Sequence, residues 1–215
     1  MLRKPACLIF GAGRPPDKRP EVGAGDLVIA ADGGYYYTQA AGIKVDALIG
    51  DFDSLAPPPD LETSGMFVLR LPKEKDQTDM MAALQYGLQN GFTSFHIYGG
   101  TGGRIDHTLA NVQSLGSLLD HGSRGYLYDG ETVITVMRGE LRLDALSSGM
   151  ISVFAFGGAA EGVYLQGLKY ELVSARLATS YPIGVSNEFI GAPAYIKAET
   201  GDLLLVYPSC TLEVG

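Results

Sequence analysis

The order in which apolar runs and helical patterns follow one another most constrains what this chain can fold into. Through about residue 120, short apolar runs bounded by Gly, Pro or Asp alternate with amphipathic segments. This alternation predicts an α/β fold, a parallel sheet flanked by helices on both faces. The expected buried strands are Cys7–Phe10, Leu27–Ala31, Ala47–Ile49, Phe67–Leu71 and Phe95–Tyr98, and the expected helices are Thr78–Asn90 and Ile105–Leu119.

The pattern changes after about Tyr128, where strand follows strand and no long helical pattern occurs. Turn residues at Gly157-Gly158, Gly184 and Gly201-Asp202 separate the runs, which predicts a smaller antiparallel β-sandwich. We therefore expect an α/β domain at residues 1–129 and a β-sandwich domain at residues 130–215. The expected strands of the second domain are Thr132–Met137, Leu141–Leu143, Met150–Phe156, Val163–Leu165, Leu172–Val173, Ala194–Ala198 and Leu203–Tyr207.

Composition excludes several classes of function. The chain has 215 residues, 46% of them hydrophobic and 19% charged, with a formal net charge of −8. So acidic a chain is poorly suited to bind nucleic acid by neutralising phosphates, but it suits a cationic substrate or a phosphate that arrives with magnesium. Cys7 and Cys210 form neither a disulfide framework nor a zinc motif, and Cys7 reads as a core residue. The run Ala6–Phe10 is too short for a signal peptide, and no run is long enough to span a membrane, so the expected location is the cytoplasm.

Four polar motifs fall at the ends of expected strands or the beginnings of expected helices. Ligands of a parallel α/β sheet bind beyond the carboxyl ends of its strands, so shared placement there indicates one site. The motifs are Ala31-Asp32-Gly33-Gly34, Gly50-Asp51-Phe52-Asp53-Ser54, Lys75-Asp76-Gln77-Thr78-Asp79 and the segment from Gly99 to His107.

Asp51 and Asp53 are candidate magnesium ligands, and Asp79 could join them from the first turn of its helix. Magnesium takes few protein carboxylates and bridges substrate phosphates. Two like charges at 4 Å repel by about 1 kcal/mol in water and about 4 kcal/mol at an effective dielectric near 20, so a carboxylate cluster needs a counter-ion. The alternative is that Asp51 and Asp53 only shape a turn or cap a helix. The presence of Asp106 at a neighbouring strand end favours the metal site over this alternative.

The segment Gly99–Gly103 carries four glycines in five residues, so its backbone N–H groups could approach phosphate oxygens at a helix N-terminus. Arg104 is placed to bind phosphate in bidentate fashion. The loop matches neither of the familiar glycine-rich phosphate motifs, and a flexible connector is the alternative. Asp32 could be an N-cap or a ligand contact, and His107 could be a general base or a structural hydrogen-bond partner.

The second half offers one candidate binding stretch, with the flat face of Tyr170 and the short polar groups of Ser186 and Asn187. Together they could fix a heterocycle. Ordinary strand side chains are the alternative.

Taken together, the motifs resemble the thiamine pyrophosphokinase family. The second and fourth blocks are specific and the others supportive. The blocks are Ala31-Asp32-Gly33-Gly34, Ile49 through Ser54, Lys75 through Asp79, Gly102 through Asn111, and Gly167-Leu168-Lys169-Tyr170 with Ser186-Asn187-Glu188. The resemblance implies a nucleotide-binding α/β domain followed by a thiamine-binding β-sandwich. It also implies a homodimer whose active sites lie between the α/β domain of one subunit and the sandwich of the other, and no nucleic-acid or membrane partner.

The resemblance implies the reaction and assigns residues to it. The pyrophosphate of ATP passes to the hydroxyl of thiamine, which gives thiamine diphosphate and AMP with the help of Mg²⁺. The implied metal ligands are Asp51, Asp53 and Asp79, and the implied catalytic residues are these three with Arg104 and Asp106. The implied ATP contacts are Asp32, Gly33, Gly34, Thr101, Gly102, Gly103 and Arg104. The implied thiamine contacts are Tyr170, Ser186 and Asn187. The chain departs from the family at Tyr170, where tryptophan is usual, and at Val185, where threonine is frequent.

The residues support an in-line attack of the thiamine hydroxyl on the β-phosphorus, with Asp106 or a metal-bound carboxylate accepting the proton. Three other functions stay open from the sequence. They are a related ATP-dependent transferase acting on another hydroxylated heterocycle, a magnesium-dependent phosphohydrolase, and a nucleotide sensor without catalysis.

Overall fold

The computed structural model describes residues 4–53, 65–74, 76–211 and 213–214. The chain divides into two compact units, Met1–Gly130 and Glu131–Gly215. Ser54, Lys75 and the proline segment Pro57–Pro59, which belong to motifs and loops read from the sequence, lie outside the described residues. Within the described part of the chain, no helix is both long enough and apolar enough to cross a membrane.

The first unit contains a parallel sheet in the order β6-β5-β1-β2-β3-β4. The sheet confirms the fold class expected from the alternating pattern. Its strands are β1 (Cys7–Phe10), β2 (Leu27–Ala31), β3 (Ala47–Gly50), β4 (Phe67–Arg70), β5 (Ser94–Tyr98) and β6 (Arg124–Asp129).

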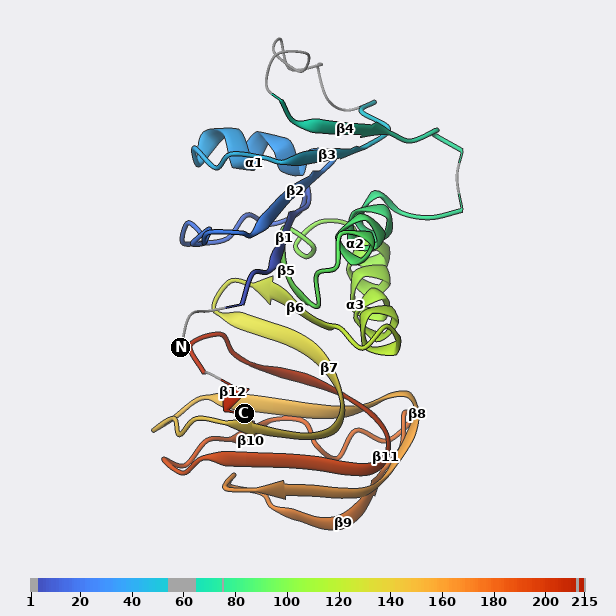
Figure 1. Cartoon of the computed structure of the whole chain (residues 1–215). Helices are drawn as coiled ribbons and strands as arrows, with labels where there is room; N and C mark the ends of the chain where they lie inside the picture. Colours follow the sequence, from blue (N-terminus) through green and yellow to red (C-terminus); the bar gives the residue numbers. More distant parts are fainter. Residues whose placement is uncertain (1–3, 54–64, 75, 212, 215) are drawn as a thin grey trace. The chain divides into compact units, whose positions relative to one another are not determined.

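Helices cover both faces of this sheet, with α1 on one face and α2 and α3 on the other (Figure 1). The chain moves outward from β1 to β4 and then returns to β5 and β6, so right-handed crossovers place the later helices on the opposite face from α1. The helices are α1 (Gly34–Ala40), α2 (Asp79–Gln89) and α3 (Ile105–Asp120). Sequence patterns missed α1, which is only 7 residues long, and also missed β6.

Alternate strand residues fill the two faces of the sheet. Leu8 and Phe10 belong to the apolar cluster on the α1 face, together with Val28. On the other face Gly87 of α2 lies so close to Phe95 that an added Cβ would sit 2.5 Å from its ring. The edge strand β4 differs from the expectation of a buried strand, because an edge has a neighbour on one side only. Its Phe67 is 45% exposed.

The second unit is antiparallel throughout its described pairings, and β11 lies between β7 and β8. Its strands are β7 (Thr132–Leu143), β8 (Met150–Gln166), β9 (Leu172–Leu177), β10 (Asn187–Glu188), β11 (Ala194–Pro208) and β12 (Glu213–Val214). Long curved strands dominate it (Figure 1), in agreement with the expected sandwich.

Three pairs of expected short strands are in fact single long strands, so the division at Gly157-Gly158 and Gly201-Asp202 was wrong. Gly157 lies inside β8 and Gly201 inside β11, both with positive φ. The pairing of β11 shifts register between Lys197 and Asp202. Glycine inside a strand marks a bulge that bends it, and a sequence pattern does not distinguish such a bulge from a turn.

Candidate active site

A cavity of about 550 Å³ lies at the carboxyl ends of the parallel strands of the first unit. Its lining comes from the loops that follow β1, β2, β3, β4 and β5 and from the first turns of α2 and α3. This is the edge at which parallel α/β sheets bind ligands, because the loops there converge while the strands hold them fixed.

The glycine-rich segment Gly99–Gly103 forms one wall of the cavity. Gly99 and Gly102 have φ values of 66° and 76°, a region that side chains other than glycine rarely adopt. The amide of Asn111 in α3, which is buried, donates to the carbonyl of Gly100 at 2.7 Å. The segment is therefore anchored to its helix, and the flexible-connector interpretation does not describe it.

A second glycine loop, Gly11-Ala12-Gly13 after β1, also lines the cavity and was missed in the sequence. The N–H of Gly13 donates to the carbonyl of Gly99 at 2.8 Å, so the two loops are joined backbone to backbone. An added Cβ on Gly13 would collide with the carbonyl oxygen of Thr101. The available signal was two glycines placed directly after the first apolar run.

Three carboxylates from three different elements line the cavity: Asp32 after β2, Asp51 after β3 and Asp79 in the first turn of α2. Asp32 has a φ of 45°, and Gly50 lets the two loops approach, because a Cβ there would lie 3.1 Å from the Asp32 side chain. Backbone conformations of this kind outside glycine concentrate at functional sites. Thr78 caps α2 by accepting the N–H of Met81 at 3.1 Å, which fixes the turn that carries Asp79.

Asp51 and Asp53 are not equivalent in the structure. Oδ1 of Asp51 accepts the N–H of Asp53 at 3.1 Å, which is the turn foreseen as an alternative. Asp53 pairs with Lys73 at 3.4 Å and is not among the described residues that line the cavity. In the parts of the chain that the structure describes, no three acidic, His or Cys side chains are grouped to hold a metal ion.

Arg104 and Asp106 bind each other at the start of α3. Arg104 Nε donates to Oδ1 of Asp106 at 3.1 Å, and its Nη2 donates to the other carboxylate oxygen. This hydrogen bond lowers the pKa of the Asp106 carboxyl and raises that of Arg104. Arg104 and His107 line the cavity, whereas Asp106 is not among the described lining residues.

Two glycines of the predicted ATP site have packing roles. Gly33 and Gly34 let α1 approach the β1 loop, because a Cβ on Gly33 would lie 2.9 Å from that of Ala12. Thr101 and Gly103 line the cavity. Gly33, Gly34 and Gly102 are not among its described lining residues.

In the second unit, Asn187 holds the backbone of Tyr170. Asn187 Oδ1 accepts the N–H of Tyr170 at 2.9 Å, and its Nδ2 donates to the carbonyl of Tyr170 at 2.6 Å. Tyr170 is 58% exposed, whereas Asn187 is buried. Ser186, with a φ of 59°, donates its N–H to Ser152. The amide of Asn187 is therefore occupied in presenting Tyr170.

A parallel sheet with carboxylates, an arginine and anchored glycine loops around one cavity defines a class of protein, the enzymes that bind nucleotide phosphates for group transfer. The family model for the catalytic domain of thiamin pyrophosphokinase matches residues 21–127, and the model for its vitamin B1 binding domain matches residues 139–203. The chain belongs to the thiamin pyrophosphokinase family.

Individual relatives agree. The thiamine pyrophosphokinase of Bacillus subtilis is 29% identical over 184 residues, which cover 84% of this chain and 86% of the relative. The crystal structure of the thiamine pyrophosphokinase from Bacillus subtilis superposes with a TM-score of 0.84 at 26% identity, covering 95% of this chain and 99% of that one. The thiamin pyrophosphokinase of Geobacillus thermodenitrificans gives 0.83 at 26% identity, covering 95% and 97%.

Proposed function

We propose that this enzyme transfers the pyrophosphoryl group of ATP to the hydroxyl of thiamine, releasing AMP and thiamine diphosphate. The observation that carries the proposal is the joint lining of one cavity by the anchored glycine loop, Arg104 and three carboxylates. Such transfers depend on positioning and on electrostatic stabilisation of phosphate charge, so the protein need not supply a strong nucleophile.

The donor set fits magnesium that arrives with a nucleotide. Magnesium is usually bound by one or two carboxylates together with waters and substrate phosphates, and does not need an all-protein cage. Asp51 and Asp79 would supply these carboxylates, and Asp53 would join them by leaving Lys73. When bound, the ion would neutralise charge on the phosphates.

The protein's own groups would bind and orient ATP. The backbone of the glycine loop and the N-terminus of α3 would face the phosphates, and Arg104 would add a guanidinium. The Arg104 pair with Asp106 would hold that guanidinium in place, and the role of Asp106 as proton acceptor stays a prediction. Asp32, Thr101 and Gly103 would complete the wall, whereas contacts of ATP with Gly33, Gly34 and Gly102 stay predictions.

Thiamine would bind through residues 130–215, with residues 1–129 taking the nucleotide. Tyr170 would stack on the thiamine rings, Asn187 would hold Tyr170 in place, and Ser186 would contribute a hydroxyl. Tyrosine is a weaker cation–π partner than tryptophan, so we expect a looser hold on thiamine than the family's usual residue gives. We also propose a homodimer whose two units share each site across subunits. The cytoplasmic location expected from the sequence stays a prediction.

Product analysis tests the reaction. The protein is incubated with thiamine, ATP and Mg²⁺, and the nucleotides are separated. AMP and thiamine diphosphate are expected in equal amounts. ADP would indicate transfer of a single phosphoryl group, and steady phosphate or pyrophosphate release without thiamine would indicate a hydrolase; either result contradicts the proposal.

Subunit complementation tests the shared site. Asp51→Asn chains are refolded together with Tyr170→Ala chains and assayed at a thiamine concentration well below the wild-type KM, where the raised KM of Tyr170→Ala leaves it little activity. Each variant is also assayed alone as a control. If sites are shared between two copies, mixed dimers regain one intact site of two, so about a quarter of wild-type activity is expected from an equal mixture. If each site lies within one chain, mixing restores nothing.

A further inference from the structure

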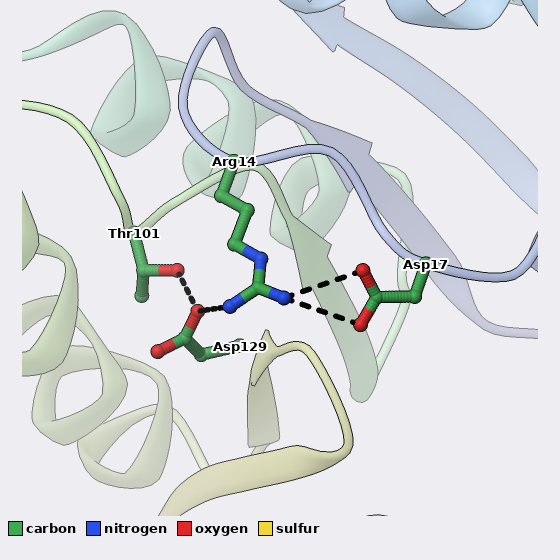
Figure 2. A network of polar contacts seen from close by, with 4 residues as sticks. All are labelled: Arg14, Asp17, Thr101 and Asp129. Atoms are coloured by element: carbon green, nitrogen blue, oxygen red, sulfur yellow. Dashed lines mark hydrogen bonds and ion pairs between the residues drawn. The ribbon is translucent and has the colours of Figure 1, made fainter.

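A polar cluster lies behind the glycine loop. It consists of Arg14, Asp17, Thr101 and Asp129 (Figure 2). Arg14 Nη2 lies 3.3 Å from both carboxylate oxygens of Asp17, and its Nη1 lies 3.7 Å from Oδ1 of Asp129. The same Oδ1 accepts the hydroxyl of Thr101 at 3.1 Å. The backbone N–H of Arg14 also donates to the carbonyl of Thr101 at 2.6 Å, which closes a ring through Arg14, Asp129 and Thr101.

Thr101 is where this cluster meets the cavity. It is the only residue from Gly99 to Gly103 with a side chain, it is 4% exposed, and it lines the cavity. Arg14, Asp17 and Asp129 are not among the described lining residues. The hydrogen bonds of the cluster therefore reach the loop at Thr101, which a backbone N–H holds on one side and a carboxylate on the other. Arg14 also packs against Gly102, where an added Cβ would lie 2.5 Å from the Cβ of Arg14.

A loop rich in glycine has much conformational freedom to lose when it closes on a ligand. That loss weakens binding unless the loop is already ordered in the free protein. The contacts of Thr101 with Arg14 and Asp129 supply this order before any ligand arrives.

The charges of the cluster would also affect the binding of a phosphate at the glycine loop. Asp129 and Asp17 would add negative charge close to a phosphate site, and Arg14 pairs with both. An exposed ion pair contributes little to folding stability, so a gain in global stability does not explain the arrangement.

We propose that Arg14 and Asp129 are positioning residues that hold the glycine loop in its phosphate-binding shape through Thr101. The inference rests on the proposed function in taking ATP as the ligand of that loop. Neither residue is a catalytic residue in this assignment, because both act through Thr101.

The test compares Asp129→Ala with Asp129→Asn. Asparagine keeps an oxygen that can accept the Thr101 hydroxyl, whereas alanine removes the acceptor. Calorimetric binding of a non-hydrolysable ATP analogue with Mg²⁺ is expected to weaken about tenfold in the alanine variant, a factor that corresponds to about 1.4 kcal/mol, and less in the asparagine variant. The KM for ATP rises in parallel, while kcat at saturating ATP and the KM for thiamine stay near wild type.

Hydrogen exchange of the segment Gly99–Gly103 gives a readout that does not depend on the ligand. Exchange is expected to be faster in Asp129→Ala than in the wild type. Arg138→Gln is the matched control, since Arg138 makes a comparable ion pair with Asp202 in the second unit, at 2.8 Å. It should leave both exchange of the loop and nucleotide binding unchanged.

The outcomes separate the two proposals. A wild-type protein that binds no nucleotide contradicts the proposed function, and hydrogen exchange then still decides the role of the cluster. Unchanged analogue binding and unchanged exchange in Asp129→Ala overturn the inference, as does an equal loss in Arg138→Gln. If Asp129→Ala fails to fold, Thr101→Val removes the same hydrogen bond at nearly constant shape, and hydrogen exchange of Gly99–Gly103 alone decides: faster exchange supports the inference and unchanged exchange overturns it.

Discussion

Arg104 and Asp106 occupy each other's charged groups at the first turn of α3, two residues apart and joined by two hydrogen bonds. Both were expected to act on the reaction, and the structure makes them one unit. A guanidinium fixed in this way is ordered before ligand binding, and its remaining N–H groups stay available to phosphate oxygens.

The lowered pKa of Asp106 predicts how activity responds to pH. Hydrogen bonding from Arg104 depresses this pKa below its ordinary 3.8. The pair's contribution to stability is therefore present above that ordinary value and is lost only as pH falls through the lower pKa of the folded protein. From about pH 5 to about pH 9, profiles of kcat for the wild type and for Asp106→Asn should show the same apparent pKa values and differ in height. A wild-type limb near neutrality that vanishes in Asp106→Asn would contradict this.

Asp51 should matter more than Asp53. Asp51 lines the cavity, whereas Asp53 faces Lys73. Asp51→Asn is expected to lower kcat by about 100-fold or more, because it would remove a carboxylate ligand of the proposed magnesium ion, and Asp53→Asn by clearly less. Initial rates of AMP formation measure both variants, and thermal melts check that each is folded. Equal losses of kcat in the two variants would mean that Asp53 matters as much as Asp51 for the reaction.

Asn187→Ala should destabilise the second unit. The substitution leaves the N–H and carbonyl of Tyr170 without their side-chain partners, a loss of about 1–3 kcal/mol in the free energy of unfolding. Urea denaturation measures it. Asn90→Ala is the control, because the amide of Asn90 makes a single exposed hydrogen bond to the backbone of Tyr86. If both variants unfold at the same urea concentration, the bonds at Tyr170 carry no special weight.

Tyr170→Ala should raise the KM for thiamine about tenfold and leave the KM for ATP unchanged, because a cation–π contact contributes about 0.5–2 kcal/mol. Tyr170→Trp should lower the KM for thiamine below that of the wild type. Tyr181→Ala, which removes another exposed aromatic ring of the second unit, is the control. A thiamine KM that does not respond to either change at Tyr170 would remove this residue from the substrate site.

Gly13→Ala should disturb the cavity although it adds one methyl group. The new Cβ would collide with the backbone oxygen of Thr101, which cannot rotate away, so we expect a loss of about 1–3 kcal/mol in stability and weaker ATP binding. Gly158→Ala is the matched control, since a Cβ there meets nothing within 4 Å. Thermal melts and calorimetry with an ATP analogue compare them. Wild-type behaviour of Gly13→Ala would mean that the two loops can separate freely.

The sequence was informative wherever a local pattern determines the structure. The strand Cys7–Phe10 and the helix that begins after Thr78 were predictable, because burial and capping leave their mark on neighbouring residues. The positions of Asp51 and Asp79 beside one cavity were predictable, because one follows a strand and the other begins a helix at the same edge of the sheet, whereas their role as metal ligands stays a prediction.

Other features depend on contacts between distant segments, which no local pattern records. The cavity-lining role of Gly13 arises from Gly99 and Thr101, and the pairing of Asp53 with Lys73 arises from the neighbouring strand β4. The amide of Asn187 was predicted to contact thiamine, and that contact stays a prediction, but the hydrogen bonds of this amide to the backbone of Tyr170 and Glu188 were not foreseen. In each case the residue itself could be seen in the sequence, but the distant residue that it contacts, which determines its role, could not.

The backbone hydrogen bond between Gly13 and Gly99 also determines how early during synthesis the cavity can form. These two residues belong to β1 and β5 loops that are far apart along the chain, so their contact forms only after most of the sheet has assembled. Non-local contacts of this kind form slowly, since a long segment must be closed first. A ribosome-bound chain that ends before β5 therefore lacks this cavity, and a ligand of the cavity can favour folding only after β5 has paired with β1.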